Sequence, residues 1–317
     1  MQRILSVFIG VTALAVQAVT VHAGDFVETA VAGLPAQTLR VEYSSAAKLR
    51  KLANYQSLHE RFLGPRLAQL ESGLAQIGIK EDNIDELLMG WRPGDKEMDL
   101  YGFASGRFDK AGIAKRAASQ SFTPTPISGE DAYCLQAGVT GTCLVLFDNS
   151  LGAFGPLGTL TALIEAHAGQ SPGLAADERM SRLLSDTRKD APIWGVAVGA
   201  AIGDWFSGWL SGQTAIKLDW SRVFEKVDSL TYSIDAADKA SLDLKLNCAT
   251  ADDAATLRQL LNGLRMAQQL AWQAQNPNQQ NPFENMNVNL NDKQVGLQVT
   301  MAYSQLQLAG GIGTPPK

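Results

Sequence analysis

Cys134 and Cys143 are the pair of residues whose type and spacing best define a covalent bond in this chain. If residues 138–139 form a two-residue hairpin loop of type II′, counting outward places the two cysteines opposite each other in a non-hydrogen-bonded pair. Such a pair holds its Cα atoms about 4.5 Å apart, within the range of a disulfide. The spacing therefore predicts a Cys134–Cys143 disulfide, although a four-residue loop over 138–141 would place Cys134 opposite Val145 instead.

Other cysteine chemistry does not fit this spacing. A zinc site needs further Cys or His ligands nearby, and a redox pair needs two cysteines separated by two residues. The third cysteine, Cys248, ends the segment SLDLKLNC, in which Leu242, Leu244 and Leu246 alternate with polar residues. Period-two alternation places these leucines and Cys248 on one core-facing side of a strand. We expect Cys248 to be a buried structural thiol.

Two short motifs match part of a catalytic or phosphate-binding sequence signature but lack the residues or the structural context that the chemistry needs. Residues 169–173 read GQSPG, but a nucleophile elbow needs a preceding strand and a backbone N–H after the serine, which proline lacks. Residues 152–158 read GAFGPLG, without the lysine of a P-loop or the glycine order of a dinucleotide site. The second segment is interpreted as a tight strand-to-helix turn. No cofactor site is expected.

The histidines and acids also form no recognisable site. His59 and His167 lie far apart and neither belongs to an HExxH pattern. The acidic segment over 80–86, KEDNIDE, lacks the calcium-loop order and is interpreted as a solvated turn before a strand. We therefore assign no catalytic residue and no metal ligand from the sequence.

An aromatic cluster gives the best indication of a binding surface. The segment GDWFSGWLSG places Trp205 and Trp209 four residues apart, on one helical face, with Phe206 beside them. Large aromatic side chains usually cover a sheet and belong to the core. The alternative is an exposed interaction patch for a partner protein, a glycan or a membrane surface.

The beginning of the chain has the pattern of a secretory signal peptide. Arg3 precedes an apolar run over 4–21, and VHA ends at Ala23 with the compact residues that an export peptidase reads. We expect cleavage after Ala23 and a periplasmic or extracellular protein in which a disulfide can persist.

The formal net charge of −5 argues against nucleic-acid binding. The only other long apolar run, over 191–203, is too short to span a membrane. We therefore expect no transmembrane span after signal removal.

An internal repeat sets the expected architecture. The segments beginning at Ile84 and Val227 match in the order strand, turn, strand, helix, and Asp85 and Asp109 match Asp228 and Asp252 at the same spacing of 143 residues. Each copy follows a strand and a helix and precedes a hairpin. Each half then has the order β-α-β-β-α-β, which is typical of a ferredoxin-like, split βαβ unit.

The sequence therefore predicts an α+β protein with two tandem ferredoxin-like α/β-sandwich halves and mainly antiparallel sheets. The expected regions are a signal peptide over 1–23, a first repeat with a helical linker over 24–190, and a second repeat over 191–317. Helices are expected in the linker at PLGTLTALIEAHA and ADERMSRLLSDTR.

The segments MDLYGFASGRFD, CLVLFDNSLGAFGPLGTLTALIEAHAG and ADERMSRLLSDTRKDAPIWGVAV resemble those of a group of exported bacterial proteins of unknown function. The resemblance covers most of the mature chain, but its motifs are structural turns and core positions. It implies tandem α/β-sandwich halves and a non-enzymatic role in the cell envelope, and it transfers no catalytic residue.

Two functions follow as hypotheses. The first is an exported, non-catalytic binding module of the envelope, whose partner is another envelope protein or a glycan. The second is an envelope hydrolase in which two carboxylates from different strands converge between the halves. The positions of those carboxylates discriminate between the two.

Overall fold

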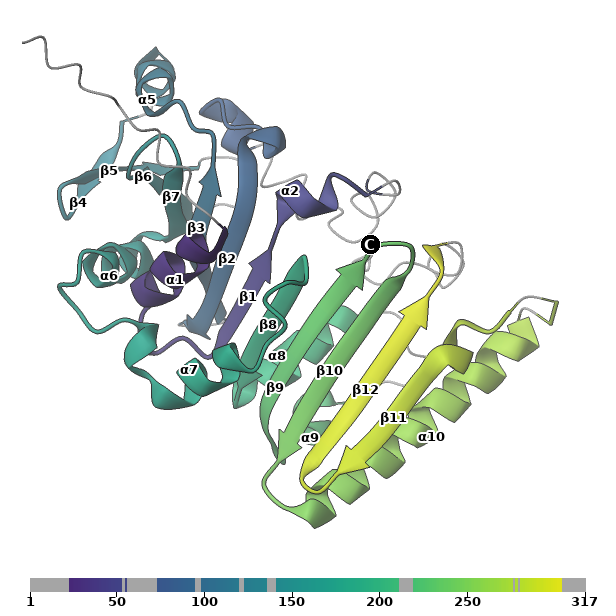
Figure 1. Cartoon of the computed structure of the whole chain (residues 1–317). Coiled ribbons are helices and arrows are strands. Elements are labelled where there is room, and N and C mark those ends of the chain that lie inside the picture. The colour runs from purple at the N-terminus through teal and green to yellow at the C-terminus, as the bar shows by residue number, and fades with distance from the viewer. Residues whose placement is uncertain are drawn as a thin grey trace, which may run out of the picture.

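The structure is a computed structural model and describes residues 23–52, 55, 73–94, 98–119, 123–135, 141–210, 219–275, 277–278 and 280–303. The signal-peptide prediction, except Ala23, and the candidate His59 lie outside these residues. Within them the chain forms one antiparallel sheet of twelve strands, flanked by helices (Figure 1). The α+β class with antiparallel strands is confirmed.

The first half of the chain supplies seven strands and the second half five, joined edge to edge through β1 and β8. The first-half strands are β1 (Arg40–Ser44), β2 (Ile84–Pro93), β3 (Met98–Gly106), β4 (Thr125–Ile127), β5 (Glu130–Cys134), β6 (Thr142–Leu146) and β7 (Leu151–Pro156). The second-half strands are β8 (Ile193–Val198), β9 (Val227–Ala236), β10 (Ala240–Cys248), β11 (Met286–Asn291) and β12 (Gln294–Met301).

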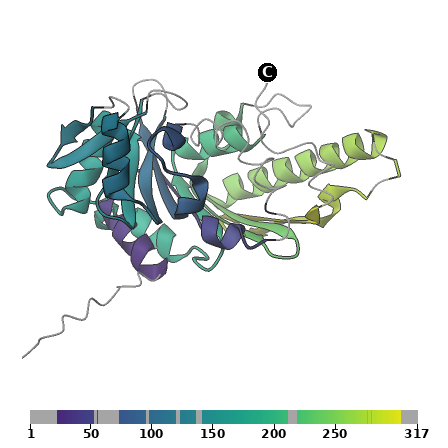
Figure 2. The same cartoon turned by 90° about the horizontal axis from the view of Figure 1, so that it is seen from above.

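The helices divide between the two faces of this sheet (Figures 1 and 2). One face, here called the front face, carries α1 (Ala23–Gly33), α6 (Leu157–His167) and α7 (Glu178–Ser185). The back face carries α5 (Lys110–Ser119), α8 (Ala200–Leu210) and α10 (Ala251–Gln275). Shorter helical segments are α2 (Ala46–Leu49), α9 (Trp220–Val223), η2 (Glu81–Asn83), η3 (Leu174–Ala176) and η4 (Pro282–Asn285). The two helices expected in the linker are α6 and α7.

The internal repeat is confirmed as structure. Strands β2 and β9 begin and end 143 residues apart, the spacing found in the sequence. The strand order is β1-β2-β3-β7-β6 in the first half and β8-β9-β10-β12-β11 in the second, counted outward from the junction. The orders correspond strand by strand, and β5 and β4 are additions at the outer edge of the first half. The two halves are therefore related by an approximate two-fold axis between β1 and β8.

The ferredoxin-like arrangement within each half is wrong in its strand order. A split βαβ unit inserts its third strand between the first two, which run parallel, whereas here the first two strands of each half are antiparallel neighbours. Strand β1 pairs directly with β2, and β8 with β9. Strand β8 occupies the second edge of β1. The pairing between the two halves therefore stands where a ferredoxin-like unit would pair its first strand with another strand of the same half. Strand alternation defines faces and not neighbours, and for this reason the sequence pattern fits both orders.

One row of directly opposed residues shows how the front face changes along the sheet. It runs through Phe103, Leu88, Tyr43, Trp194, Ser233, Asp243, Gln298 and Asn287 on eight successive strands from β3 to β11. The first four residues belong to a hydrophobic core covered by α1, α6 and α7. The last four are polar. Helices therefore cover the front face over the first half and β8, and the face changes from apolar to polar between β8 and β9.

The back face has its own cores in both halves. In the first half, Ile113 and Ala117 of α5 pack with Leu144 and Leu146 of β6. In the second half, residues of α8 and α10 pack on Leu244, Leu246 and Leu297. Because α5 and α10 follow equivalent strands, both copies of the repeat use the same face for their own helix. Within the described residues, helices cover both faces over the first half and β8 only.

Candidate binding face

The predicted disulfide is present in the structure. Cys134 and Cys143 are bonded, and they are directly opposed in the β5–β6 pairing. The amide of Leu135 donates to the carbonyl of Thr142 at 2.9 Å, so the cysteines occupy the next, non-hydrogen-bonded position. The register deduced from the sequence is confirmed, although the loop at 138–139 lies outside the described residues. Cys143 is buried, and the bond fastens the hairpin to the front core.

The interpretation of the tryptophan segment as an exposed interaction patch is wrong for two of its three residues. Trp205 is 2% and Phe206 5% exposed, and both belong to the back core of the second half. The Trp205 ring contacts that of Tyr232, and Phe206 stacks on Phe224. Helix α8 lies against the sheet, so the aromatic face that a partner would need is used for folding. The side chain of Trp209 lies outside the described residues.

His167 and Cys248 have structural surroundings. The His167 ring lies 5.5 Å from that of Phe103 and 4.6 Å from that of Phe147, between centroids, and burial lowers its pKa while Asp148 opposes the shift. Cys248 is a buried free thiol, as predicted, and burial raises its pKa. In the described part of the chain, no three His, Cys, Asp or Glu side chains are grouped so that they could hold a metal ion.

The remaining motifs also fall in structural positions. GQSPG follows α6 in a turn, which agrees with its rejection as a nucleophile elbow, and GAFGPLG runs from β7 into α6. Among the helices of the described residues, none is long and apolar enough to cross a membrane.

Two carboxylates lie near the junction of the halves, but they do not converge. Glu42 accepts hydrogen bonds from Arg40, at 2.7 Å, and from the hydroxyl of Tyr232 on the back face. Glu86 accepts from Tyr43, whose ring belongs to the front core. The two acids therefore act on opposite faces of the sheet, where each stabilises a tyrosine hydroxyl, and they do not form an acid pair around one bond.

The feature that remains is the front face of β9, β10, β12 and β11, here called the open face. None of the described helices covers its outer three strands, and Figure 1 shows these strands uncovered toward the viewer. Three rows of opposed residues cross it, namely Ser229–Asn247–Gln294–Asn291, Thr231–Lys245–Gly296–Asn289 and Ser233–Asp243–Gln298–Asn287. Apart from Gly296, every residue in these rows has a polar side chain, and only Lys245 and Asp243 are charged. The three β9 residues, Ser229, Thr231 and Ser233, are buried.

The side chains of the open face are held in place by one another. The amide nitrogen of Asn247 donates to the Ser229 hydroxyl at 3.0 Å, and that of Gln294 donates to the Asn247 oxygen at 2.9 Å. Gln298 donates to Asp243 at 3.1 Å. These bonds run across the strands, perpendicular to the chain direction, and fix the position of the amide groups, each of which keeps further donor or acceptor capacity.

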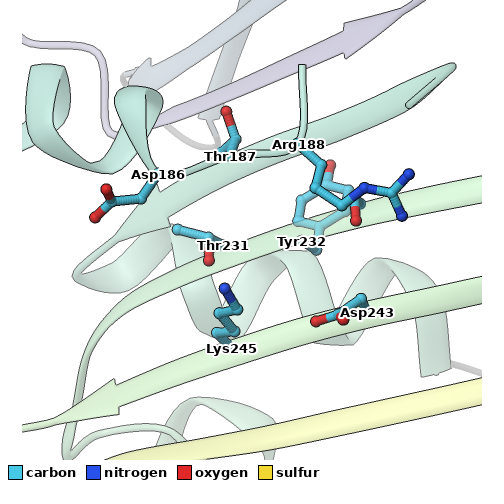
Figure 3. A pocket seen from close by; sticks show the side chains of 8 residues that line it. Asp186, Thr187, Arg188, Thr231, Tyr232, Asp243 and Lys245 are labelled. Atoms are coloured by element: carbon cyan, nitrogen blue, oxygen red, sulfur yellow. The ribbon is translucent and has the colours of Figure 1, made fainter. Parts of the chain in front are cut away.

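A shallow depression marks the end of the open face nearest the first half (Figure 3). The loop after α7 overhangs β9 and β10 there, so that Asp186, Thr187 and Arg188 lie beside the strands. Arg188 is paired with Asp190 at 3.1 Å and with Asp235 at 3.5 Å, and these carboxylates raise its pKa. The remaining lining comes from Thr231, Tyr232, Ser233, Asp243 and Lys245.

Sequence reasoning missed the open face, although its signal is visible. The strands read SLTYS, DLKLN, MNVNLN and QVGLQ, in which polar residues occupy every second position. Such alternation predicts one polar side for each strand. It does not predict that these four polar sides are contiguous, or that those of β10, β12 and β11 are left uncovered by the described helices, because both depend on the strand order and on where the linker helices pack.

The fold and this face together define an α+β protein with a duplicated antiparallel sheet. The structure is similar to that of TP0453 in crystal form III, with a TM-score of 0.54 at 11% identity over 88% of this chain and 96% of that one. Crystal form I of TP0453 gives a TM-score of 0.51 at 9% identity, over 88% and 95%. No family model and no curated protein matches the chain. The likeness concerns the fold alone.

Proposed function

We propose that the chain is an exported, non-catalytic binding module whose open face holds an uncharged, hydroxyl-rich glycan. The observation that supports this is the aligned set of amide side chains on β10, β12 and β11, of which Asn287, Asn289, Asn291 and Gln298 are exposed. The hydroxyls beside them on β9, those of Ser229, Thr231 and Ser233, are buried. Sugar hydroxyl and acetamido groups both donate and accept hydrogen bonds, and asparagine and glutamine side chains do the same. An extended glycan chain matches a flat surface better than a compact ligand, which needs a deep pocket.

Other ligand classes fit the open face less well. Its rows hold no aromatic or aliphatic side chain, whereas the centre of a protein–protein interface is rich in such residues. Its paired strand residues include one cation, Lys245, and two acids, Asp243 and Asp235, and the formal charge of the chain is −5, so a nucleic acid would be repelled. A membrane surface would need apolar or basic side chains there.

Export is the second part of the proposal. It is supported by the signal-peptide pattern over 1–23. Helix α1 begins at Ala23 and places Phe26, Ala30 and, after its end, Leu34 in the front core. Cleavage after Ala23 would remove none of these core residues. The mass of the protein recovered from its own cell envelope tests this, because an N-terminus at Gly24 is expected and an uncleaved chain would contradict export.

Glycan binding can be tested by titrating the protein with the hexamer of N-acetylglucosamine and with a linear glucose hexamer. In proton–nitrogen NMR spectra, we expect the side-chain NH₂ signals of Asn289 and Gln298 to shift at ligand concentrations of about 1 mM or less. Replacement of both residues by alanine should abolish binding. The matched control is Gln273→Ala, an exposed amide on α10 at the back of the molecule. Unchanged NH₂ signals with both hexamers would contradict the proposal.

A further inference from the structure

The two edges of the sheet are protected very differently. The edge strand of the first half, β4, has only three residues, and its central residue, Pro126, has no N–H to offer another strand. The edge strand of the second half, β11, has six residues, MNVNLN, without proline or charge. Proteins usually protect an exposed edge with charges, proline, bulges or a short strand, because an unpaired edge is a template for another chain. Strand β11 has none of these devices.

The phase of the β11–β12 hairpin determines which backbone groups point outward. Asn291 and Gln294 flank a two-residue loop, so they are the hydrogen-bonded closing pair. By alternation Asn289 and Asn287 also bond to β12, and Val288 and Leu290 direct their N–H and C=O groups away from it. Met286 agrees with this phase, since its N–H donates to Phe283 and its carbonyl accepts from Arg265. Within the described residues, no strand pairs with the outer edge of β11.

We propose that β11 pairs with β11 of a second copy of this chain, antiparallel and centred on Asn289. In an antiparallel pair, directly opposed residues share a face of the sheet. Centred on Asn289, the pairing places Asn287 opposite Asn291 and Val288 opposite Leu290. Asparagines then meet on the open face and apolar residues on the back. The strand is thus complementary to itself, as a two-fold interface requires.

Charge selects this register over its neighbour. A pairing centred on Val288 would oppose the carboxylates of Asp292 and Glu284 from the two copies, which is unfavourable. In the register centred on Asn289, Asp292 of one copy lies opposite Met286 of the other. Asn289 itself then occupies a non-hydrogen-bonded position, because its own backbone groups are bonded to β12.

The molecule already contains a junction of this kind. Equivalent strands β1 and β8 join the two halves edge to edge, and α5 and α10 stay on the same face. Pairing through β11 would repeat this arrangement between copies and extend the open face across the interface. The helix nearest this edge, α10, also carries Leu260, Met266 and Leu270, which are 37%, 58% and 65% exposed. These apolar side chains lie in the layer that a second copy would cover.

Cysteine trapping tests the pairing and its register. Opposed residues at a non-hydrogen-bonded position have Cα atoms about 4.5 Å apart, which suits a disulfide. Asn289→Cys is therefore expected to form a disulfide-linked dimer on mild oxidation. Asn287→Cys, which faces position 291, and Gln298→Cys, on the interior strand β12, should remain mostly unlinked. The background is low because the one free thiol of the described residues, Cys248, is buried.

Sedimentation of the full-length mature protein over a concentration series tests the equilibrium. The wild type is expected to dimerise, and Val288→Pro should weaken the dimer at least about tenfold, since it removes an outward N–H and spares the β12 ladder. Asn289→Lys, which opposes two positive charges, should do the same if the proline variant fails to fold. A monomeric wild type overturns the proposal, as does a dimer that neither variant weakens. The inference does not depend on glycan binding.

Discussion

The hydroxyl of Tyr232, in the second half, donates a hydrogen bond to Glu42, in the first half, across the intervening strand β8. Gly195 lies between them and opposes both residues. Arg40 donates to the same carboxylate and stacks over Trp91, with 3.9 Å between its guanidinium carbon and the ring centroid. This contact fastens the halves on the back face, close to where the front core ends.

We expect Tyr232 and Glu42 to be energetically coupled. Tyr232→Phe should lower the free energy of unfolding by about 1–3 kcal/mol, because a half-buried carboxylate loses a donor. In a double-mutant cycle with Glu42→Gln, measured by urea unfolding, the combined loss should be smaller than the sum of the single losses. Tyr303→Phe is the matched control, because its hydroxyl bonds to Ala236 within one half and should not couple to Glu42. Strict additivity of Tyr232 and Glu42 would argue against the contact.

The glycine at position 195 should tolerate no side chain. A Cβ there would lie 2.6 Å from the ring of Tyr232, and Gly195→Ala is therefore expected to destabilise the protein by about 1–3 kcal/mol. Gly263→Ala, in the middle of α10, is the comparison, since a Cβ there meets nothing within 4 Å. It should stabilise by about 0.5–1 kcal/mol through helix propensity. Thermal unfolding of both variants checks the opposite signs, and equal effects would contradict this packing.

Tyr101 should make stability fall at high pH. Its side chain is buried, its hydroxyl lies 2.6 Å from that of Thr38, and burial raises its pKa from 10.0 to about 12. The folded state therefore favours the protonated phenol. The resulting stability is present below pH 10 and is lost as the pH rises to about 12, by roughly 2 kcal/mol. Urea unfolding across this range should show a shallower decline for Tyr101→Phe than for wild type, and identical slopes would contradict the assignment.

Removal of the disulfide should destabilise the first half. The loop between Cys134 and Cys143 is short, so replacing both by serine is expected to cost about 2–3 kcal/mol of unfolding free energy. The reduced wild-type protein should show a similar loss, and adding reductant to the double-serine variant should change nothing. A stability unaffected by reductant in the wild type would show that the bond contributes little.

The features that could be predicted from the sequence are those determined locally. The repeat, the Cys134–Cys143 register and the buried position of Cys248 all follow from strand alternation and turn geometry over short distances. The pairing of β1 with β8 could not be predicted in this way, because it joins residues about 150 positions apart and alternation carries no information on neighbours. The incorrect ferredoxin-like order has the same cause.

The candidate site was harder to predict from the sequence for a similar reason. A spacing of four residues places Trp205 and Trp209 on one helical face, but it does not say whether that face meets the sheet or solvent. The polar positions of β9 to β12 were visible, yet the exposure of β10, β12 and β11 depends on the linker helices α6 and α7 packing over the first half and β8 instead. Position in the assembled fold, and not residue type, decides both outcomes.

The unequal covering of the front face by helices has an evolutionary consequence. After a duplication, two equivalent faces start with the same demands, but here α1, α6 and α7 cover the front face of the first copy, and none of the described helices covers β10, β12 and β11 of the second. Around Phe103 and Trp194, natural variation is then limited by volume, as in any tightly packed core. Around Gln298 and Asn287, whose side chains are exposed, that limit on volume does not apply. The first copy therefore keeps its front face for packing, whereas the outer strands of the second copy carry a face whose side chains can change without altering the volume of the core.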